Sequence, residues 1–563
     1  MKILGITSAP DSGAALIDDN RIVAAANEER FTRVKLHRIF PVNSINYVLS
    51  QGNTSMDEID VVASGAWKGY NPKVLPGILD RSLESFSKNP ESKKVIMDRF
   101  NVSLDSDAEQ KKDFIASLKK EGWKSKKLMF VDHHLSHAYT AFYCSPFKEA
   151  LVLTIDGRGD LKSLTMSIAS ESEGIREIDW LSELDSLGYY YGIITAGLGF
   201  KPHRHEGKIT GLAAYGDPAK CLSAMKSMIS WDKERIVSNL GDWYKPFFKP
   251  TPDNLAREIS SNKREDIAAS CQYWLEQLVC NYIKRFLKEY NIGNLCLSGG
   301  VFANVKLNQR IKDLPGVENV YIHPHMGDGG VGTGAALYAL YHNNGELKRP
   351  LKNVYLGPSF SNEEIEPVLK KFGVSYQEVN DKARLAAELL EKNKVVGWFQ
   401  GRMEYGPRAL GNRSILFPAI DPKVNDFLNK RLHRTEFMPF APVTLFDKAS
   451  LLYSGWKNNH IASNFMTMCY DCTDKMKDET PAVVHVDGTA RPQTIIREDN
   501  PDYYDVLNEY YKKTKLASII NTSFNDHEEP IVCSPEDALN SFLKDNVDRL
   551  IIGDFLVEGQ KSK

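Results

Sequence analysis

Two histidines and two aspartates in the first part of the chain have the residue types and spacing of a metal site. His133 and His137 are four residues apart, so on a helix both imidazoles would lie on one face. Asp156 ends the apolar run 150–155, which predicts a buried strand, and Asp328 also follows a strand pattern and precedes glycines. Two imidazoles and two carboxylates suit a divalent transition metal. The alternative is that the histidines only form hydrogen bonds within the core.

The second half of the chain concentrates arginines in loops rich in glycine or proline. Arg402, Arg408, Arg413 and Arg491 all lie in such loops, beside serine or threonine hydroxyls. Planar guanidinium groups there suit bidentate binding of phosphate or pyrophosphate. Arg408 and Arg413 are therefore candidate catalytic clamps on a polyphosphate. The alternative is a set of surface arginines paired with acidic residues.

The elements that would position these residues begin with two similar hairpins. Residues 1–25 predict a strand, a turn that contains aspartate and glycine, and two further strands, and residues 150–170 repeat this design. Actin-like, sugar-kinase-like α/β domains have this organisation, with two such loops facing each other across a cleft that holds a nucleotide or a metal. Because turns favour aspartate and glycine in any fold, the hairpins alone do not establish it.

A glycine pair at another strand end indicates a ligand loop. An amphipathic helix is expected over 266–290, and a buried strand at 295–297 then runs into Gly299 and Gly300 before Asn304. Paired glycines between a strand and a helix let backbone amides approach an anionic or ribosyl ligand closely.

The length of 563 residues predicts more than one domain. A polar, proline-containing stretch around 343–355 marks the expected boundary, which gives domains at 1–347 and 351–563. The second has its own strand patterns, at 395–399 and 516–520.

Composition narrows the class of protein. A net charge of −2 argues against a large sequence-independent nucleic-acid surface. No run approaches the ~20 apolar residues of a transmembrane helix, and no membrane partner is expected. The N-terminus opens directly into a strand pattern without a signal peptide, so the expected compartment is the cytoplasm. Eight scattered cysteines do not form a disulfide framework.

Together these residues resemble the O-carbamoyltransferases of the NodU/CmcH type, over nearly the whole chain. The resemblance rests on seven motifs in the family's order: residues 27–33 (NEERFTR), His133 with His137, 156–160 (DGRGD), 206–213 (EGKITGLA), 299–304 (GGVFAN), 406–414 (GPRALGNRS) and 521–525 (NTSFN).

The resemblance implies an actin-like (ASKHA-type) N-terminal domain and a YrdC-like C-terminal domain, each with an active site. The C-terminal domain would form carbamoyladenylate from carbamoyl phosphate and ATP with Mg²⁺. The N-terminal domain would hold it on Fe(II) or another divalent metal, bound by the four residues above, and pass the carbamoyl group to an acceptor hydroxyl. The cofactor-binding residues would be Lys208, Gly299, Gly300, Asn304, Arg402, Glu404, His485, Thr489, Arg491, Asn521, Thr522 and Ser523.

The chain departs from the family pattern in two places. Relatives often carry a histidine where this chain has Pro10, so Asp11 and Lys35 become the candidates for handling the acceptor proton. Leu432 and Met438 stand where two basic residues are expected; Arg431 and Arg434 are candidate replacements.

The acceptor is left open by the sequence. The first expectation is the hydroxyl of a small molecule such as an antibiotic, toxin or sugar, and the second is a hydroxymethylated base in a nucleotide or DNA. Residues 66–125 are the region expected to determine which acceptor binds. Trp67 and Tyr70 in this region could stack on bases, so a nucleic acid is allowed but not favoured. A homodimer is also allowed. An actin-like kinase or ATPase is the alternative of another class.

Overall fold

The computed structural model divides into two units, each built from separate stretches of the chain. Described are residues 1–8, 10–65, 68, 90–124, 127–245, 251–343, 350–434 and 437–560. Unit 1 comprises Met1–Val23, Arg38–Ile45 and Leu49–Leu351, and unit 2 comprises Ala24–His37, Asn46–Val48 and Lys352–Lys563. Trp67 and Tyr70, the predicted stacking residues, lie outside the described residues.

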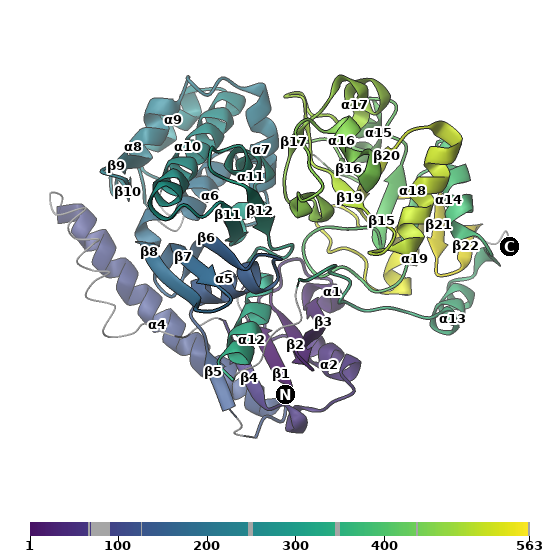
Figure 1. Cartoon of the computed structure of the whole chain (residues 1–563), viewed down its shortest axis with the longest axis horizontal. Coiled ribbons are helices and arrows are strands. Elements are labelled where there is room, and N and C mark those ends of the chain that lie inside the picture. Colours follow the sequence, from purple (N-terminus) through teal and green to yellow (C-terminus); the bar gives the residue numbers. More distant parts are fainter. Residues whose placement is uncertain are drawn as a thin grey trace. The chain divides into compact units, whose positions relative to one another are not determined.

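Unit 1 contains two five-stranded sheets of the same design (Figure 1). In each, the first strand is antiparallel to the second and parallel to the strand on its other side. The first sheet has the order β3-β2-β1-β4-β5, with β1 Ile3–Thr7, β2 Gly13–Asp18, β3 Arg21–Asn27, β4 Val61–Ser64 and β5 Lys127–Phe130. The second has the order β8-β7-β6-β11-β12, with β6 Glu149–Gly159, β7 Lys162–Ser170, β8 Gly174–Ser182, β11 Asn294–Ser298 and β12 Asn319–Ile322. This duplication confirms the predicted actin-like α/β fold.

Two helices pack against each other and against these sheets. Helix α5 (His133–Tyr143) contacts β6 and β11, and α12 (Val331–Tyr341) contacts β1, β2 and β4. Gly334 makes the helix contact close, since a Cβ built there would lie 1.9 Å from the carbonyl oxygen of Ser136. The position of α5 is thus fixed by backbone-to-backbone packing.

The remaining elements of unit 1 connect or extend the sheets. No helix of the described residues is both long and apolar enough to cross a bilayer. Helix α1 (Glu29–Thr32) follows β3 and lies in unit 2. The others are α2 Val42–Gln51, α4 Pro90–Lys120, α6 Leu187–Gly197, α7 Glu206–Leu212, α8 Leu222–Met228, α9 Asp253–Ser261, α10 Arg264–Tyr290 and α11 Val305–Lys312, with the small hairpin β9 Ile229–Asp232 and β10 Arg235–Ser238.

Strand β6 differs from the prediction that it ends at Asp156. Ile155 pairs with Leu164, and the ladder resumes where Gly159 pairs with Lys162. Three residues of β6 therefore oppose one residue of β7, which forms a bulge over residues 156–158. The aspartate–glycine sequence predicted a turn. Instead, β6 bulges over three residues and then pairs with β7 again.

Unit 2 is built on one eight-stranded mixed sheet of order β13-β22-β21-β14-β15-β20-β16-β19. Its strands are β13 Val374–Glu378, β14 Val396–Phe399, β15 Arg413–Phe417, β16 Ala441–Leu445, β19 Gln493–Ile495, β20 Ser518–Ser523, β21 Arg549–Ile552 and β22 Phe555–Gln560, and β17 Tyr470–Asp471 pairs with β18 Thr489–Ala490. Its helices are α13 Asn362–Phe372, α14 Lys382–Glu391, α15 Val424–Arg431, α16 Ala449–Leu452, α17 Asp474–Glu479, α18 Pro501–Thr514 and α19 Pro535–Leu543.

The core of unit 2 lies between the sheet and two helices. Trp398, Leu416 and Ile519 of the central strands pack with Leu390 of α14 and Tyr503 of α18, all at most 2 % exposed. The strands predicted at 395–399 and 516–520 correspond to β14 and β20, and both belong to this core.

A segment from the N-terminal part of the chain completes unit 2. Arg30 donates to the carbonyl oxygen of Gly406 (2.8 Å), and Arg33 donates to the carbonyl oxygens of Pro530 and Ile531 (both 2.7 Å). These bonds explain why residues 24–37 group with unit 2, which the sequence did not predict.

The close packing of α12 on α5 predicts a large cost for one added methyl group. Gly334→Ala should lower the free energy of unfolding by about 2 kcal/mol, because the new Cβ meets a backbone carbonyl that cannot move aside. Gly207→Ala is the matched control, a helical glycine with no described atom within 4 Å of the added Cβ. Denaturant unfolding should show that only Gly334→Ala is destabilised; equal effects would contradict the packing argument.

Candidate functional site

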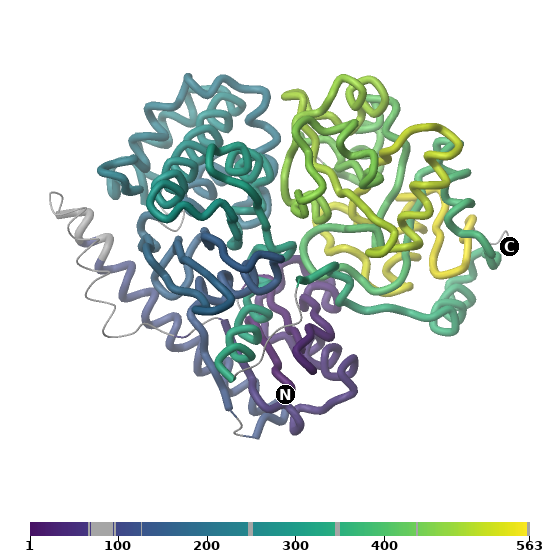
Figure 2. The backbone as a smooth tube through the Cα atoms, viewed as in Figure 1, coloured from purple at the N-terminus to yellow at the C-terminus, as the bar shows by residue number. Residues whose placement is uncertain are grey.

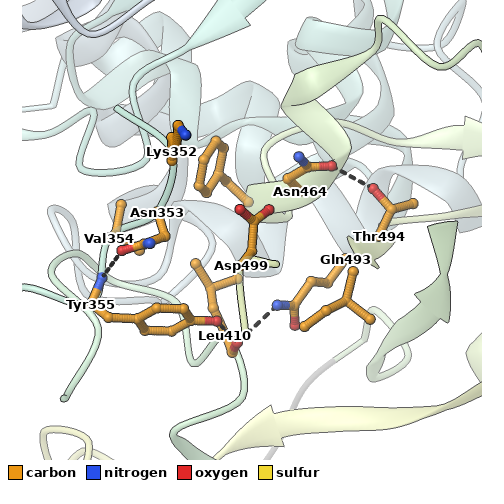
Figure 3. A pocket seen from close by; sticks show the side chains of 11 residues that line it. Lys352, Asn353, Val354, Tyr355, Leu410, Asn464, Gln493, Thr494 and Asp499 are labelled. Atoms are coloured by element: carbon orange, nitrogen blue, oxygen red, sulfur yellow. Dashed lines mark hydrogen bonds between the residues drawn. The ribbon is translucent and has the colours of Figure 1, made fainter. Parts of the chain in front are cut away.

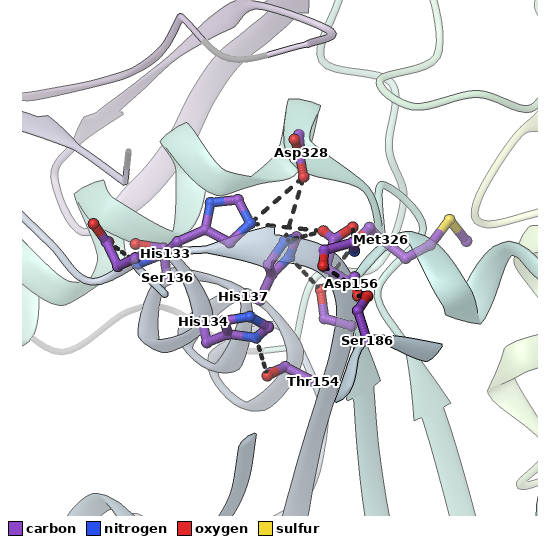
Figure 4. Close-up of polar contacts among 12 residues, drawn as sticks. His133, His134, Ser136, His137, Thr154, Asp156, Ser186, Met326 and Asp328 are labelled. Carbon is purple, nitrogen blue, oxygen red and sulfur yellow. Dashed lines mark hydrogen bonds and ion pairs between the residues drawn. The ribbon is translucent and has the colours of Figure 1, made fainter. Parts of the chain in front are cut away.

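The structure brings the four predicted metal ligands together in unit 1 (Figure 4). His133 and His137 come from successive turns of α5, Asp156 from the bulge of β6, and Asp328 from the 3₁₀ turn Asp328–Gly330 that precedes α12. One ligand atom from each lies within 4.8 Å of the others. The histidine side chains are at most 5 % exposed and the carboxylates about one fifth exposed, so the cluster opens on its carboxylate side.

Within the cluster, one nitrogen–oxygen pair is at hydrogen-bond distance and the other three are farther apart. His137 Nε2 lies 3.2 Å from Asp156 Oδ2 and 3.8 Å from Asp328 Oδ1. His133 Nε2 lies 3.6 Å from the same two oxygens, and this buried nitrogen has no hydrogen-bond partner among the described residues. Nitrogen and oxygen donors each about 2.1 Å from one ion would lie roughly 3–4 Å apart. The residues therefore fit a divalent metal.

Neighbouring groups orient these ligands. His137 Nδ1 lies 3.1 Å from Ser298 Oγ, and that hydroxyl donates to the carbonyl oxygen of Met326 (3.3 Å). Ser298 therefore accepts the Nδ1 proton, which leaves Nε2 of His137 as a lone-pair donor toward the cluster. His134 points away, to Thr154 Oγ1 at 2.8 Å, and is not a ligand.

The charges of the cluster also favour a cation. Burial opposes protonation of His133, but the carboxylates of Asp156 and Asp328 outweigh burial and raise its pKa to about 9. Burial, and then repulsion by Asp156, raise the pKa of Asp328. Two carboxylates in a buried space thus attract positive charge, which a proton or a metal ion can supply.

The predicted glycine loop lies against this cluster. Gly299 has φ +104°, and a Cβ there would lie 2.2 Å from the carbonyl oxygen of Ile155. A Cβ on Gly300 would lie 3.2 Å from Asp156 Oδ1. The two glycines let the loop after β11 approach the bulge of β6, so the loop borders the ligand Asp156.

The other predicted cofactor residues of unit 1 belong to a neighbouring network. Asn304 caps α11 by accepting from the Leu307 amide, and its side-chain amide donates to Gln272 Oε1 (2.7 Å). Gln272 also accepts from Tyr191, which contacts Thr210 of α7. Helix α7 also carries Lys208, which is buried. The predicted cofactor-binding role of Lys208 stays a prediction.

Asp11 and Lys35 do not share a unit. Asp11 lies in the β1–β2 turn of unit 1 with φ +62°, and its Oδ2 is 3.6 Å from Nε2 of the buried His325. Lys35 belongs to unit 2, where burial lowers its pKa. His325 was not among the predicted site residues, although the His-Pro-His sequence that ends three residues before Asp328 was a visible signal.

In unit 2, Glu404 and Arg413 organise the loop that carries Arg408. Glu404 Oε1 accepts from the backbone amides of Leu410, Asn412 and Arg413 (2.7–3.2 Å). The Arg413 side chain is fully buried, donates to four carbonyl oxygens and stacks 3.7 Å from the Phe399 ring centroid. This placement revises the expectation for Arg413, because its donors already hold backbone rather than a phosphate.

The predicted residues of 521–525 are held by Arg434. Its guanidinium donates to Thr522 Oγ1 (2.7 Å) and to the backbone and hydroxyl oxygens of Ser523 (2.8 and 3.2 Å). The Asn521 side chain donates to Gln493 and to the carbonyl oxygen of Ala409. Arg434, a candidate replacement for the basic residues expected at 432 and 438, therefore lies beside the 521–525 motif.

The remaining predicted residues of unit 2 are Arg402, which binds backbone carbonyl groups, and Arg408, Arg491, His485 and Thr489. Arg402 donates to the carbonyl oxygens of Leu356 and Gly357 (2.7 and 3.3 Å). Arg408 is half-buried in its loop, as is Arg491. The last two predicted residues meet at one carboxylate: His485 Nδ1 lies 3.4 Å from Asp487 Oδ1, and the Thr489 hydroxyl donates to the same oxygen (2.7 Å).

A small cavity in unit 2 borders the same loops (Figure 3). Gln493 Nε2 and the Tyr355 hydroxyl both donate to the carbonyl oxygen of Leu410 (2.8 Å each) in its wall. None of the predicted site residues lines it. Its wall braces the loop that carries Arg408, and the cavity adds no candidate site.

The carbonyl-binding role of Arg413 predicts a stability defect. Arg413→Lys should lower the free energy of unfolding by about 2–3 kcal/mol, because an ammonium group cannot serve four carbonyl oxygens in the guanidinium plane. Arg408→Lys, a half-buried arginine of the same loop, is the matched control. Thermal unfolding of both variants decides; an Arg413→Lys protein as stable as wild type would restore the clamp role expected from the sequence.

Comparison with known proteins extends over both units. Residues 2–337 match the family model described as carbamoyltransferase N-terminus, and residues 387–559 match the model described as carbamoyltransferase C-terminus. An uncharacterized protein of Methanocaldococcus jannaschii is 34 % identical over 99 % of this chain and 100 % of its own length. Nodulation protein NolNO of Sinorhizobium fredii is 31 % identical over 97 % of this chain and 79 % of its length.

Solved structures resemble this chain only distantly. The HypF protein of T. kodakarensis covers 61 % of this chain and 48 % of its own chain, with 11 % identity and a TM-score of 0.32. That likeness carries no argument about function. The two family models together span most of the sequence, and the chain belongs to the carbamoyltransferase family.

Proposed function

We propose that this transferase is an ATP-dependent O-carbamoyltransferase with one reaction in each unit. The observation that carries the proposal is the convergence of His133, His137, Asp156 and Asp328 in unit 1 of a carbamoyltransferase-family chain. The cluster opens on its carboxylate side, where a carbamoyl donor could reach a bound ion. Unit 2 supplies a separate set of arginine-bearing loops, which suits an adenylation step.

In unit 2 we infer formation of carbamoyladenylate. Carbamoyl phosphate and water give carbamate and phosphate; a carbamate oxygen then attacks the α-phosphorus of ATP, and pyrophosphate leaves with Mg²⁺. Arg408 and Arg491 are the half-buried arginines that would bind the departing pyrophosphate. Glu404 and Arg413 position the Arg408 loop through its backbone. Lys35 also lies in unit 2, where burial lowers its pKa, and its role in handling the acceptor proton stays a prediction.

In unit 1 we infer transfer of the carbamoyl group to the acceptor hydroxyl. A metal ion at the His133–His137–Asp156–Asp328 cluster would act as a Lewis acid on the carbamoyl or phosphate oxygens. Asp11 would accept the hydroxyl proton at its carboxylate. His325, which is 3.6 Å from Asp11, would stabilise that carboxylate and orient it.

The acceptor is proposed as the hydroxyl of a small molecule such as an antibiotic, toxin or sugar. Relatives of this chain include nodulation proteins, whose names state no acceptor. A hydroxymethylated nucleobase is the second candidate. Incubating acceptors of each class with ATP and carbamoyl phosphate and looking for the mass of one added carbamoyl group separates the two. An actin-like kinase would instead consume ATP without carbamoyl phosphate.

The metal cluster makes the first prediction about activity. His137→Ala should lose bound divalent metal and carbamoyl transfer together, because it removes one of four ligands and the partner of Ser298. Pyrophosphate release that depends on carbamoyl phosphate should remain, since it belongs to unit 2. His134→Ala is the neighbouring control, whose imidazole faces Thr154 and should keep the metal. Metal analysis that finds full occupancy in both His133→Ala and His137→Ala would sink the assignment.

The second prediction separates the half-reactions. Arg408→Ala should slow carbamoyl-phosphate-dependent pyrophosphate release by roughly 100-fold, the effect of removing one preorganised donor at a developing anion. Fresh carbamoyladenylate, supplied to this variant, should still give carbamoylated acceptor from unit 1. Pyrophosphate assays and product mass measure the two steps separately. Normal pyrophosphate release with failed transfer would mean that the roles of the units are reversed.

A further inference from the structure

We propose that Asp107, Arg158 and Glu183 form a positioning network that holds the metal-bearing bulge of β6, with Asp107 as its anchor on the long helix α4. The inference rests on the metal site of the proposed function. It assigns a task to residues that contact no predicted ligand site directly, and it gives α4 a reason to have its unusual length.

The bulge needs support from outside the sheet. Residues 156–158 have no partners on β7, because the ladder passes from Ile155–Leu164 to Gly159–Lys162. The Ser186 hydroxyl holds part of it, since it donates to the carbonyl oxygens of Asp156 (3.2 Å) and Gly157 (2.7 Å). These contacts fix the main chain near Asp156, and the Arg158 side chain adds a further anchor at the far end of the bulge.

The end of the bulge is also tied to the first metal ligand. Asp160 Oδ2 accepts from the His133 amide (2.9 Å), and a Cβ on Gly159 would lie 2.1 Å from the His133 ring. A shift of residues 158–160 would therefore move His133 as well as Asp156. Contacts that fix the position of Arg158 therefore also fix His133 and Asp156, two of the four ligands.

Arg158 is held by two buried acids. Its Nη2 donates to both oxygens of Asp107 (2.6 and 2.7 Å), and its Nε lies 3.1 Å from Glu183 Oε2. The side chains of Asp107 and Glu183 are 6 % and 0 % exposed. The Ser103 hydroxyl donates to Glu183 Oε1 (2.8 Å), and Arg99 Nε lies 3.3 Å from the same oxygen.

Asp107 shares one face of α4 with Arg99 and Ser103, the two residues that contact Glu183. Arg99, Ser103 and Asp107 are spaced four residues apart, so their side chains stack on one face. In the duplicated fold, α4 connects β4 to β5 as α11 connects β11 to β12, yet α4 has 31 residues and α11 has 8 (Figure 2). The longer connection is what carries Asp107 to the bulge.

The energetics favour a positioning role over a purely stabilising one. Desolvating several charges costs nearly as much as their attraction returns, so a buried ion network is weak evidence for stability. Two acids hold the guanidinium at two different nitrogens, Asp107 at Nη2 and Glu183 at Nε, and this fixes the Arg158 side chain in one orientation. Removing a partner that orients a metal ligand typically weakens metal affinity by about 10- to 100-fold.

The test compares Asp107→Asn with Asp105→Asn in the full chain. Asp105 lies on the same helix, two residues away and exposed, so it is a matched control. The probe is Co²⁺, titrated by its visible absorption, which reports both affinity and ligand geometry. Because Asp107 acts through Arg158 and not on a ligand directly, Asp107→Asn should bind Co²⁺ about 10-fold more weakly, the low end of that range, with an altered spectrum, while Asp105→Asn behaves as wild type. Carbamoyl-phosphate-dependent pyrophosphate release should be unchanged in both.

A second variant guards against a folding defect. Ser103→Ala removes one hydroxyl and keeps every charge of the network, so it should fold and weaken Co²⁺ binding by a smaller factor. Wild-type affinity and spectrum in Asp107→Asn, or in Ser103→Ala if Asp107→Asn does not fold, would overturn the inference. If the wild-type protein binds Co²⁺ but carbamoylates no acceptor, the proposed function is wrong. The comparison of Co²⁺ affinities would still test the positioning role of Asp107, Arg158 and Glu183.

Discussion

Unit 1 depends on the backbone contact between α12 and α5. Gly334 brings its helix against the carbonyl oxygen of Ser136, and α5 carries both histidines of the cluster on either side of Ser136. The same α12 is preceded directly by the turn that holds Asp328. One close helix contact therefore sets the distance between three of the four ligands, and only the bulge of β6 has to be placed independently.

In unit 2, the loops that carry the predicted site residues are positioned in a different way. Its loops are held by side chains that bind backbone groups: Glu404 accepts three amides, Arg413 donates to four carbonyl oxygens, and Arg434 fixes residues 522–525. Loops built in this way can present half-buried arginines such as Arg408 without regular secondary structure around them.

The sequence predicted those parts of the fold that depend on local pattern. The i, i+4 histidines, the two hairpins and the strands at 395–399 and 516–520 follow from spacing and apolar periodicity, and the structure contains them. The task of Arg413 could not be predicted, because one of its acceptors, the carbonyl oxygen of Pro358, is 55 residues away in the chain. The bulge after Ile155 was equally hidden, since an aspartate–glycine sequence signals a turn whether or not the strand resumes.

The N-terminal segment that joins unit 2 has a consequence for synthesis on the ribosome. Residues 24–37 emerge early, but Arg30 and Arg33 bind carbonyl groups of residues 406 and 530–531. At about 5–20 residues per second, the last of these partners appears on the order of half a minute to two minutes later. For most of that interval Arg30 and Arg33 lack these carbonyl partners, and Phe31 lacks Met403, on which it finally packs. The nascent chain must keep this short stretch soluble until residues 530–531 have been made.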